Sequence, residues 1–137
     1  MSVRKLVLAW IVGFVPMFAL SGLWHMVVAL SLYDGGPVTV RFSLIAAGYV
    51  VLSLLMAYTY PIGHKGGSPV LEGIRFGALI GLIWVLPYSL VWTGAIGGEI
   101  GILVIDALWH VVEQSVGGLA IALVYGGSKR DSADSAD

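Results

Sequence analysis

The chain contains no cysteine and very few charged residues. Without cysteine it cannot form a disulfide, a thiolate metal site, a covalent c-type haem link or a cysteine nucleophile. Only 11% of its residues are charged, whereas an average soluble domain carries about 25%. So few charges cannot build a surface that is soluble in water. We therefore expect lipid to cover much of this surface.

The residues that fill the chain are mostly apolar. Hydrophobic residues make up 58% of the 137 residues, and the mean hydropathy is +0.95. A transmembrane helix needs about 20 apolar residues, so four spans and short loops use nearly the whole length. The four spans are predicted at about residues 6–32, 40–60, 71–96 and 100–125. The sequence predicts an all-α membrane protein, a four-transmembrane-helix bundle over residues 1–126, with a disordered polar tail at 127–137.

Turn residues separate the predicted spans. Residues 34–37 read Asp-Gly-Gly-Pro, in which glycine permits positive φ and proline removes a backbone donor. Before the third span, Ser68 is a candidate N-cap, Pro69 suits the first helical position, and Glu72 falls in the first turn. Within that span, Pro87 removes a backbone hydrogen bond and should kink the helix.

Two further features are expected near the polar loop before the third span. His64 is interpreted as a solvated loop histidine. Glu72 and Arg75 are spaced three residues apart, as in a modest ion pair on one helix face.

The distribution of lysine and arginine predicts the orientation, because cytoplasmic loops carry an excess of both. One side of the predicted bundle receives Arg4, Lys5, Lys65, Arg75, Lys129 and Arg130, and the other receives only Arg41. This asymmetry places both termini in the cytoplasm and the protein in the cytoplasmic membrane. A cleavable signal peptide is an alternative reading of residues 3–21. The apolar run continues through residue 32 with no polar sequence after the supposed cleavage point, which disfavours that reading.

The fourth span is unusual because it carries ionisable residues. At 100° per residue, Asp106, His110, Glu113 and Gly117 lie within a stripe about 60° wide. An aspartate at the centre of a membrane helix costs about 2.5 to 3.5 kcal/mol on insertion scales. We therefore expect this stripe to face the bundle interior, a water-filled cavity or another subunit.

The first span offers a possible partner for this stripe. Leu23-Trp24-His25 in the first span is repeated as Leu108-Trp109-His110 in the fourth. The two spans run in opposite directions, and the rise of 1.5 Å per residue places the two histidines at similar depths. We predict that His25 and His110 face one another and share one polar site with Asp106.

Four interpretations of this cluster remain open. His25, Asp106, His110 and Glu113 offer nitrogen and oxygen ligands for a divalent metal ion. The two histidines could instead be axial ligands of a haem. An intramembrane Asp/His/Glu chain could relay protons or bind a translocated ion. The reading that the residue types favour most is structural, with hydrogen bonds among these groups and to hydroxyls fixing the helix register.

The third span carries Gly73, Gly77 and Gly81 at four-residue spacing. Small residues at this spacing let membrane helices pack closely, so we predict a helix-packing face. Packing within one chain is the favoured reading, and a homo-oligomer face is the alternative. Apart from the lipid bilayer, the partners left open are a second copy and a larger membrane complex, to which the chain would be an accessory subunit. The scattered lysines and arginines predict no nucleic-acid binding.

An enzyme is the least supported class. The sequence has no Ser/His/Asp order, no glycine-rich phosphate loop and no paired carboxylates at a water interface, so no catalytic residue is predicted. The function expected from the residues is that of an integral membrane protein whose polar cluster fixes helix packing or binds a small ligand or ion.

The arrangement resembles small four-helix bacterial membrane proteins that are classified as domains of unknown function. The likeness lies in Gly22-Leu23-Trp24, in the glycine-rich segment 73–81, and in Ala107–Val112 followed by Gly117-Gly118. It covers most of the chain, but Asp106 and Glu113 lie outside the shared pattern. The resemblance implies the four-helix membrane fold and brings no activity or cofactor.

Overall fold

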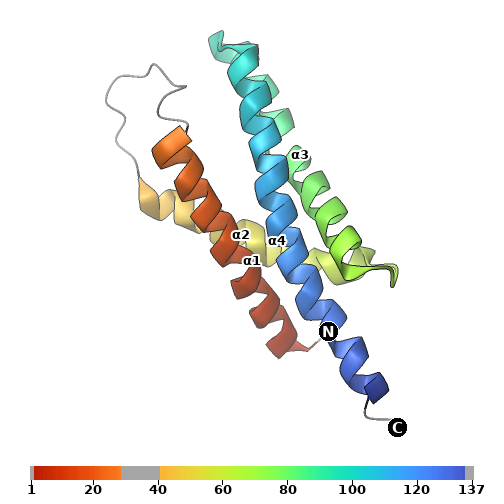
Figure 1. The fold of residues 1–137 in the computed structure, drawn as a ribbon. Coiled ribbons are helices and arrows are strands. Elements are labelled where there is room, and N and C mark those ends of the chain that lie inside the picture. Colours follow the sequence, from red (N-terminus) through yellow and green to blue (C-terminus); the bar gives the residue numbers. More distant parts are fainter. Residues whose placement is uncertain (1, 29–40, 135–137) are drawn as a thin grey trace.

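A computed structural model describes residues 2–28 and 41–134 of the chain. These residues form four α-helices and one π-helical turn, and no strand (Figure 1). The elements are α1 (Val3–Leu23), η1 (Trp24–Val28), α2 (Phe42–Gly63), α3 (Pro69–Ile96) and α4 (Ile100–Asp134).

Four helical segments are long and apolar enough to cross a membrane, and the first of them combines α1 with most of η1. These segments are Val3–Val27, Phe42–Gly63, Pro69–Ile96 and Ile100–Gly126. The prediction of an all-α fold with four long apolar helices is thereby confirmed for the part of the chain that the structure describes. The predicted end of the first span at residue 32 and the predicted turn at 34–37 lie outside the described residues.

The ends of α3 follow local sequence signals. Pro69 occupies the first helical position after Ser68, and Glu72 lies in the first turn. At the other end Gly97 has φ 75°, a left-handed conformation that favours glycine, and its N–H donates to the Thr93 carbonyl at 2.9 Å. Because α4 begins at Ile100, the connection is short, and α3 and α4 are antiparallel neighbours.

The helix α4 is longer than its predicted span. It runs on to Asp134, through most of the segment for which the sequence predicts a disordered tail. Extending an existing helix adds one hydrogen bond for each residue fixed and needs no new nucleus, which gives a physical reason for the continuation.

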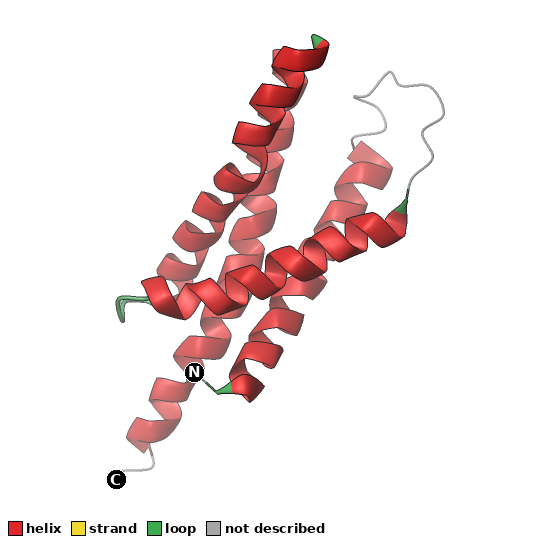
Figure 2. Cartoon of the chain, turned by 180° about the vertical axis from the view of Figure 1, so that it is seen from behind, coloured by secondary structure: helices red, strands yellow, loops and turns green. Residues whose placement is uncertain are grey.

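The helix α4 lies at the centre of the arrangement. It packs against α3 along one side and α1 along another, whereas no contact joins α1 to α3. Figure 2 shows α2 crossing the other helices obliquely. The start of α1, the end of α4 and the α2–α3 loop lie at one end of the bundle, here called the terminal end; the α3–α4 turn lies at the opposite end, here called the turn end (Figure 1).

The contact between α3 and α4 is made by backbone. Gly73, Gly77 and Gly81 are all buried. A Cβ built on Gly77 would lie 2.6 Å from the backbone carbon of Gln114, and one built on Gly81 would lie 2.9 Å from that of His110. No real Cβ approaches backbone so closely. The three glycines predicted to pack a helix therefore allow the backbone of α3 to contact that of α4.

Two side-chain hydrogen bonds attach the oblique helix α2. The Trp10 indole N–H in α1 donates to the Val50 carbonyl at 3.0 Å, and the Tyr125 hydroxyl in α4 donates to the Ala57 carbonyl at 2.9 Å. The apolar core between these helices consists of Ala9, Met17, Tyr49, Leu52, Met56, Ala57, Tyr60, Ile121 and Ala122.

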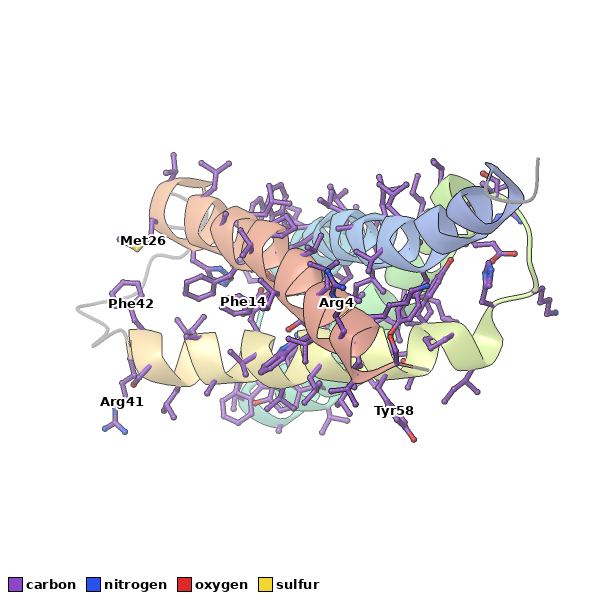
Figure 3. All side chains as sticks on the ribbon, turned by 90° about the horizontal axis from the view of Figure 1, so that it is seen from below. Arg4, Phe14, Met26, Arg41, Phe42 and Tyr58 are labelled. Carbon is purple, nitrogen blue, oxygen red and sulfur yellow. The ribbon has the colours of Figure 1, made fainter. Side chains whose placement is uncertain are left out.

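The outer surface of the bundle is largely apolar. Large aliphatic side chains such as Ile83, Val91 and Leu108 are exposed. In Figure 3, Phe14 lies between α1 and α2, whereas Tyr58 points away from the bundle. Such a surface suits lipid, in agreement with the low charge of the chain.

Candidate functional site

A hydrogen bond between η1 and α4 joins two polar groups near the turn end. The Trp24 indole N–H donates to Oδ1 of Asp106 at 3.3 Å. Trp24 is buried, whereas the Asp106 side chain keeps 21% of its surface exposed. Trp24 belongs to the π-helical turn, and such turns are frequent at functional sites. Asp106 thus has a hydrogen-bond partner from another helix. Such a partner is expected because an unpaired carboxylate inside a membrane helix is energetically costly.

The same tryptophan stacks on a second one in α4. The Trp24 and Trp109 rings are 4.8 Å apart between centroids, with their planes 10° from parallel. These residues are the central members of the two Leu-Trp-His segments. The repeated segments therefore meet, but through tryptophan.

The two histidines have matching local hydrogen bonds and different surroundings. His25 Nδ1 donates to the Ser21 carbonyl at 2.9 Å, and His110 Nδ1 donates to the Asp106 carbonyl at 2.8 Å. His110 is buried, with its Nδ1 3.7 Å from Oδ2 of Asp106. His25 is exposed.

The predicted meeting of His25 with His110 is therefore corrected. Trp24 makes the contact with α4, and the next residue on a helix is turned by about 100°. The structure brings Asp106 and His110 together with two tryptophans, and it leaves His25 on the outside of the bundle.

Glu113 lies deepest in the stripe and is fully buried. The Gln114 amide N–H donates to its Oε1 at 2.9 Å. The Tyr49 hydroxyl of α2 and the Trp109 indole lie within interaction range of the same carboxyl. Three buried polar atoms in this group accept or donate no hydrogen bond among the described residues: Glu113 Oε2, Gln114 Oε1 and Trp109 Nε1. Buried unpaired polar atoms are rare, so this group is the strongest candidate for a site.

Burial increases stepwise along the stripe. The side chain of Asp106 is 21% exposed and that of His110 is 8% exposed, while Glu113 has no exposed surface. Successive members are separated by three or four residues, about one helical turn each. The three groups thus form a row that leads from the turn end towards the interior.

The described residues give no support to the metal or haem interpretations. Among residues 2–28 and 41–134, no group of three or more His, Cys, Asp or Glu side chains could hold a metal ion. His25 is exposed while His110 is buried, and no contact between the two rings appears among the described residues. Of the four residues proposed as metal ligands, Asp106, His110 and Glu113 share one face, and His25 does not.

A second polar cluster orders the α2–α3 loop at the terminal end. Oε2 of Glu72 pairs with Nδ1 of His64, and Oε1 accepts from the Gly67 N–H at 2.8 Å. The His64 ring stacks on Tyr60, with ring centroids 5.5 Å apart. His64 is therefore held in a cluster and is not a freely solvated loop residue, and the partners of Glu72 lie in the loop. The pairing of Glu72 with Arg75 was expected from helix spacing alone. That spacing takes no account of the loop, which turns back and brings His64 and Gly67 to Glu72.

Sequence reasoning missed four members of the site: Trp24, Tyr49, Trp109 and Gln114. Gln114 directly follows Glu113 and is itself a costly residue in a membrane helix, which was an available signal. The repeated tryptophans offered a second signal. Nothing in the sequence separates the buried Tyr49 from Tyr58, which is exposed on the same helix.

Comparison of the chain with protein-family models, with curated proteins and with solved structures gave no match. The resemblance to the four-helix family of unknown function stays a prediction, and the site itself has to carry any argument about function.

Proposed function

We propose that the chain is a multi-pass protein of the cytoplasmic membrane, with both termini in the cytoplasm, and that it transports a small cation by way of Glu113. The observation that carries this proposal is the buried, half-paired carboxyl at the middle of the apolar segment of α4. Orientation follows from the asymmetry of lysine and arginine, which puts the terminal end in the cytoplasm and the turn end outside.

The position of Glu113 supports a transported ion. Its residue number lies thirteen after Ile100 and thirteen before Gly126, the two ends of the apolar segment of α4. Ionisable groups at this depth are expensive, and in membrane proteins they mark ion pathways and proton relays. A purely structural role would favour a fully paired carboxyl, whereas Glu113 Oε2 has no hydrogen-bond partner among the described residues.

The row of polar groups favours a gated carrier over an open pore. From the turn end, Asp106 and His110 lead to Glu113. Beyond Glu113 towards the terminal end, the core around α4 consists of apolar residues such as Met17, Ile121 and Ala122. A row of polar groups on one side and apolar packing on the other leave the carboxyl approachable from the turn end, as one state of an alternating-access carrier requires.

Transport should be tested with purified protein in lipid vesicles. An imposed gradient of protons, sodium or potassium should dissipate faster than in protein-free vesicles. Glu113→Gln keeps the size and polarity of the side chain and removes its ability to hold a charge, so it should abolish this flux.

The matched control for that experiment is Glu99→Gln. It makes the same chemical change at the exposed α3–α4 turn and should leave the flux unchanged. Equal flux through wild-type and Glu113→Gln protein, for every ion tried, would rule out the transport proposal.

A further inference from the structure

We infer that the ion bound at Glu113 is a proton and not a metal cation, and that Tyr49, Trp109 and Gln114 determine this choice. The inference rests on the proposed function, since it names the ion carried by the same carboxyl.

The neighbours of the carboxyl mostly present hydrogen atoms to it. The Gln114 amide donates to Oε1, and the Tyr49 hydroxyl and the Trp109 indole N–H lie within interaction range. An indole offers only a donor, and its positive end opposes a metal cation bound to the same oxygen. Hydrogen-bond donors of this kind suit a carboxyl group that gains and loses a proton, and they do not suit one that binds a metal ion.

The oxygen atoms around Glu113 are too few for a metal ion. Hard cations take six or more oxygen ligands in proteins. The unpaired oxygens in this group are Glu113 Oε2 and Gln114 Oε1. The backbone carbonyls of α4 nearby are acceptors in the helix itself. A metal ion that lost its hydration shell would therefore not regain a full shell here.

A proton satisfies this arrangement in a way that no metal cation can. On Oε2 it turns one of the two unpaired acceptors into a donor, and the adjacent Gln114 Oε1 is the acceptor that it needs. Together with the existing bond from the Gln114 amide to Oε1, the acid and the amide would form a cyclic pair with two hydrogen bonds. The bound proton also removes the charge from the middle of the membrane.

The row of polar groups supplies a route for this proton. His110 lies between Asp106 and Glu113 in the stripe, and its Nδ1 is 3.7 Å from Oδ2 of Asp106. A neutral imidazole has one nitrogen that carries a proton and a second that can accept one, so it is suited to pass a proton between two carboxyl groups. Because His110 Nδ1 keeps its own proton on the Asp106 carbonyl, the proton that leaves Asp106 is held at His110 Nε2, is released from there and is bound at Oε2 of Glu113, with charge conserved at each step.

The test measures protonation of Glu113 directly. Dicyclohexylcarbodiimide adds to protonated carboxyl groups in apolar surroundings, and peptide mass spectrometry locates the modified residue. Labelling of Glu113 in the detergent-purified full chain should fall as the pH rises from about 5 to about 9. At constant pH it should be the same with or without an excess of sodium, potassium or calcium chloride.

Protection by one of these metal ions at constant pH would overturn the proton assignment. A second measurement covers the case in which the reagent cannot reach the site: the infrared C=O band of a protonated carboxyl, which should decrease with rising pH and be absent in Glu113→Gln. The absence of both labelling and this band at every pH would equally contradict the inference.

Variants of the neighbours test the cause of the selection. Tyr49→Phe removes a donor that favours the charged carboxylate, so labelling of Glu113 should persist to higher pH. Tyr58→Phe makes the same change on the outside of α2 and should leave the pH profile unchanged. An unchanged profile in Tyr49→Phe would remove Tyr49 from the proposed mechanism.

The two proposals fail separately. Flux that depends on Glu113 but is carried by sodium would contradict the proton assignment and leave transport intact. A carboxyl that is protonated as expected, in a protein without any flux, would contradict transport and leave the proton site intact.

Discussion

Trp24 of η1 stacks on Trp109 of α4, with ring centroids 4.8 Å apart and planes 10° from parallel. The two indoles also lie beside the two acidic groups of the site. Trp24 donates to Asp106, and Trp109 lies within interaction range of Glu113. The stacked pair thus lies between the partly exposed carboxyl and the buried one, and changes to either tryptophan should affect both.

The hydrogen bond from Trp24 to Asp106 should contribute to stability. Trp24→Phe keeps an aromatic ring for stacking and removes the indole N–H, so we expect a loss of about 1 kcal/mol in the free energy of unfolding. A double-mutant cycle with Asp106→Ala, measured by unfolding in detergent, should give a coupling of about 0.5 to 1.5 kcal/mol. Trp84→Phe is the control, because Trp84 is exposed on α3. Additive effects of the two substitutions would show that the bond is not formed.

The glycine contact between α3 and α4 predicts a large difference between two chemically identical substitutions. Gly77→Ala adds a Cβ that would lie 2.6 Å from the Gln114 backbone, so overpacking should cost about 1 to 3 kcal/mol. Gly94→Ala adds the same atom on α3 where nothing lies within 4 Å, and it should be neutral or slightly stabilising. Thermal unfolding in detergent measures both. Similar melting temperatures for the two variants would contradict the close packing.

Disulfide formation can test how α1 sits on α4, because the chain has no native cysteine. A Cβ built on Gly117 lies 2.6 Å from Cγ of Met17, which places the two Cβ atoms within roughly 4 Å, as a disulfide requires. Met17→Cys with Gly117→Cys should therefore crosslink on oxidation. His25→Cys with His110→Cys should not, because His25 is exposed on the outside of the bundle. Efficient crosslinking of the histidine pair would restore the shared-site prediction.

The orientation predicted from lysine and arginine can be tested with reporter fusions. Fusions after residues 35, 66, 97 and 130 should report outside, inside, outside and inside in that order. A C-terminal reporter found outside would mean that the chain has a different number of spans or the opposite orientation.

The loop cluster at the terminal end should control exchange of one amide. Glu72 accepts a hydrogen bond from the Gly67 N–H at 2.8 Å, so Glu72→Gln should weaken that bond and speed hydrogen exchange at Gly67. The expected change is local, and exchange in the middle of α3 should stay the same. Exchange at Gly67 that is as fast in the wild type as in the variant would show that the loop is not held by Glu72.

The fold could be predicted because the membrane imposes simple rules. Four apolar runs of sufficient length, separated by turn residues, predict four helices, and small residues at four-residue spacing mark a close contact. In α4 the ionisable residues share one stripe, which indicated the face that turns inward. His110 and Glu113 are indeed buried.

The details of the site could not be predicted because α1 carries no such stripe. A helix that is apolar all round contains no periodic signal that says which face meets a neighbour. The shift from His25 to Trp24 is a rotation by one residue, and it decides whether a histidine or an indole faces Asp106. The same reason explains why Tyr49 could not be told apart from Tyr58.

The central place of α4 has a consequence for the making of the protein. Ribosomes synthesise the chain from its N-terminus to its C-terminus, so α4 is the last of the four helices to be made. Until then α3 has almost no neighbour, because its glycine face matches only the backbone of α4. A chain interrupted during synthesis before α4 would leave the glycine face of α3 without its partner helix, while α1 and α2 could still contact each other. Completion of the last helix is therefore the step that commits the whole bundle to its final form.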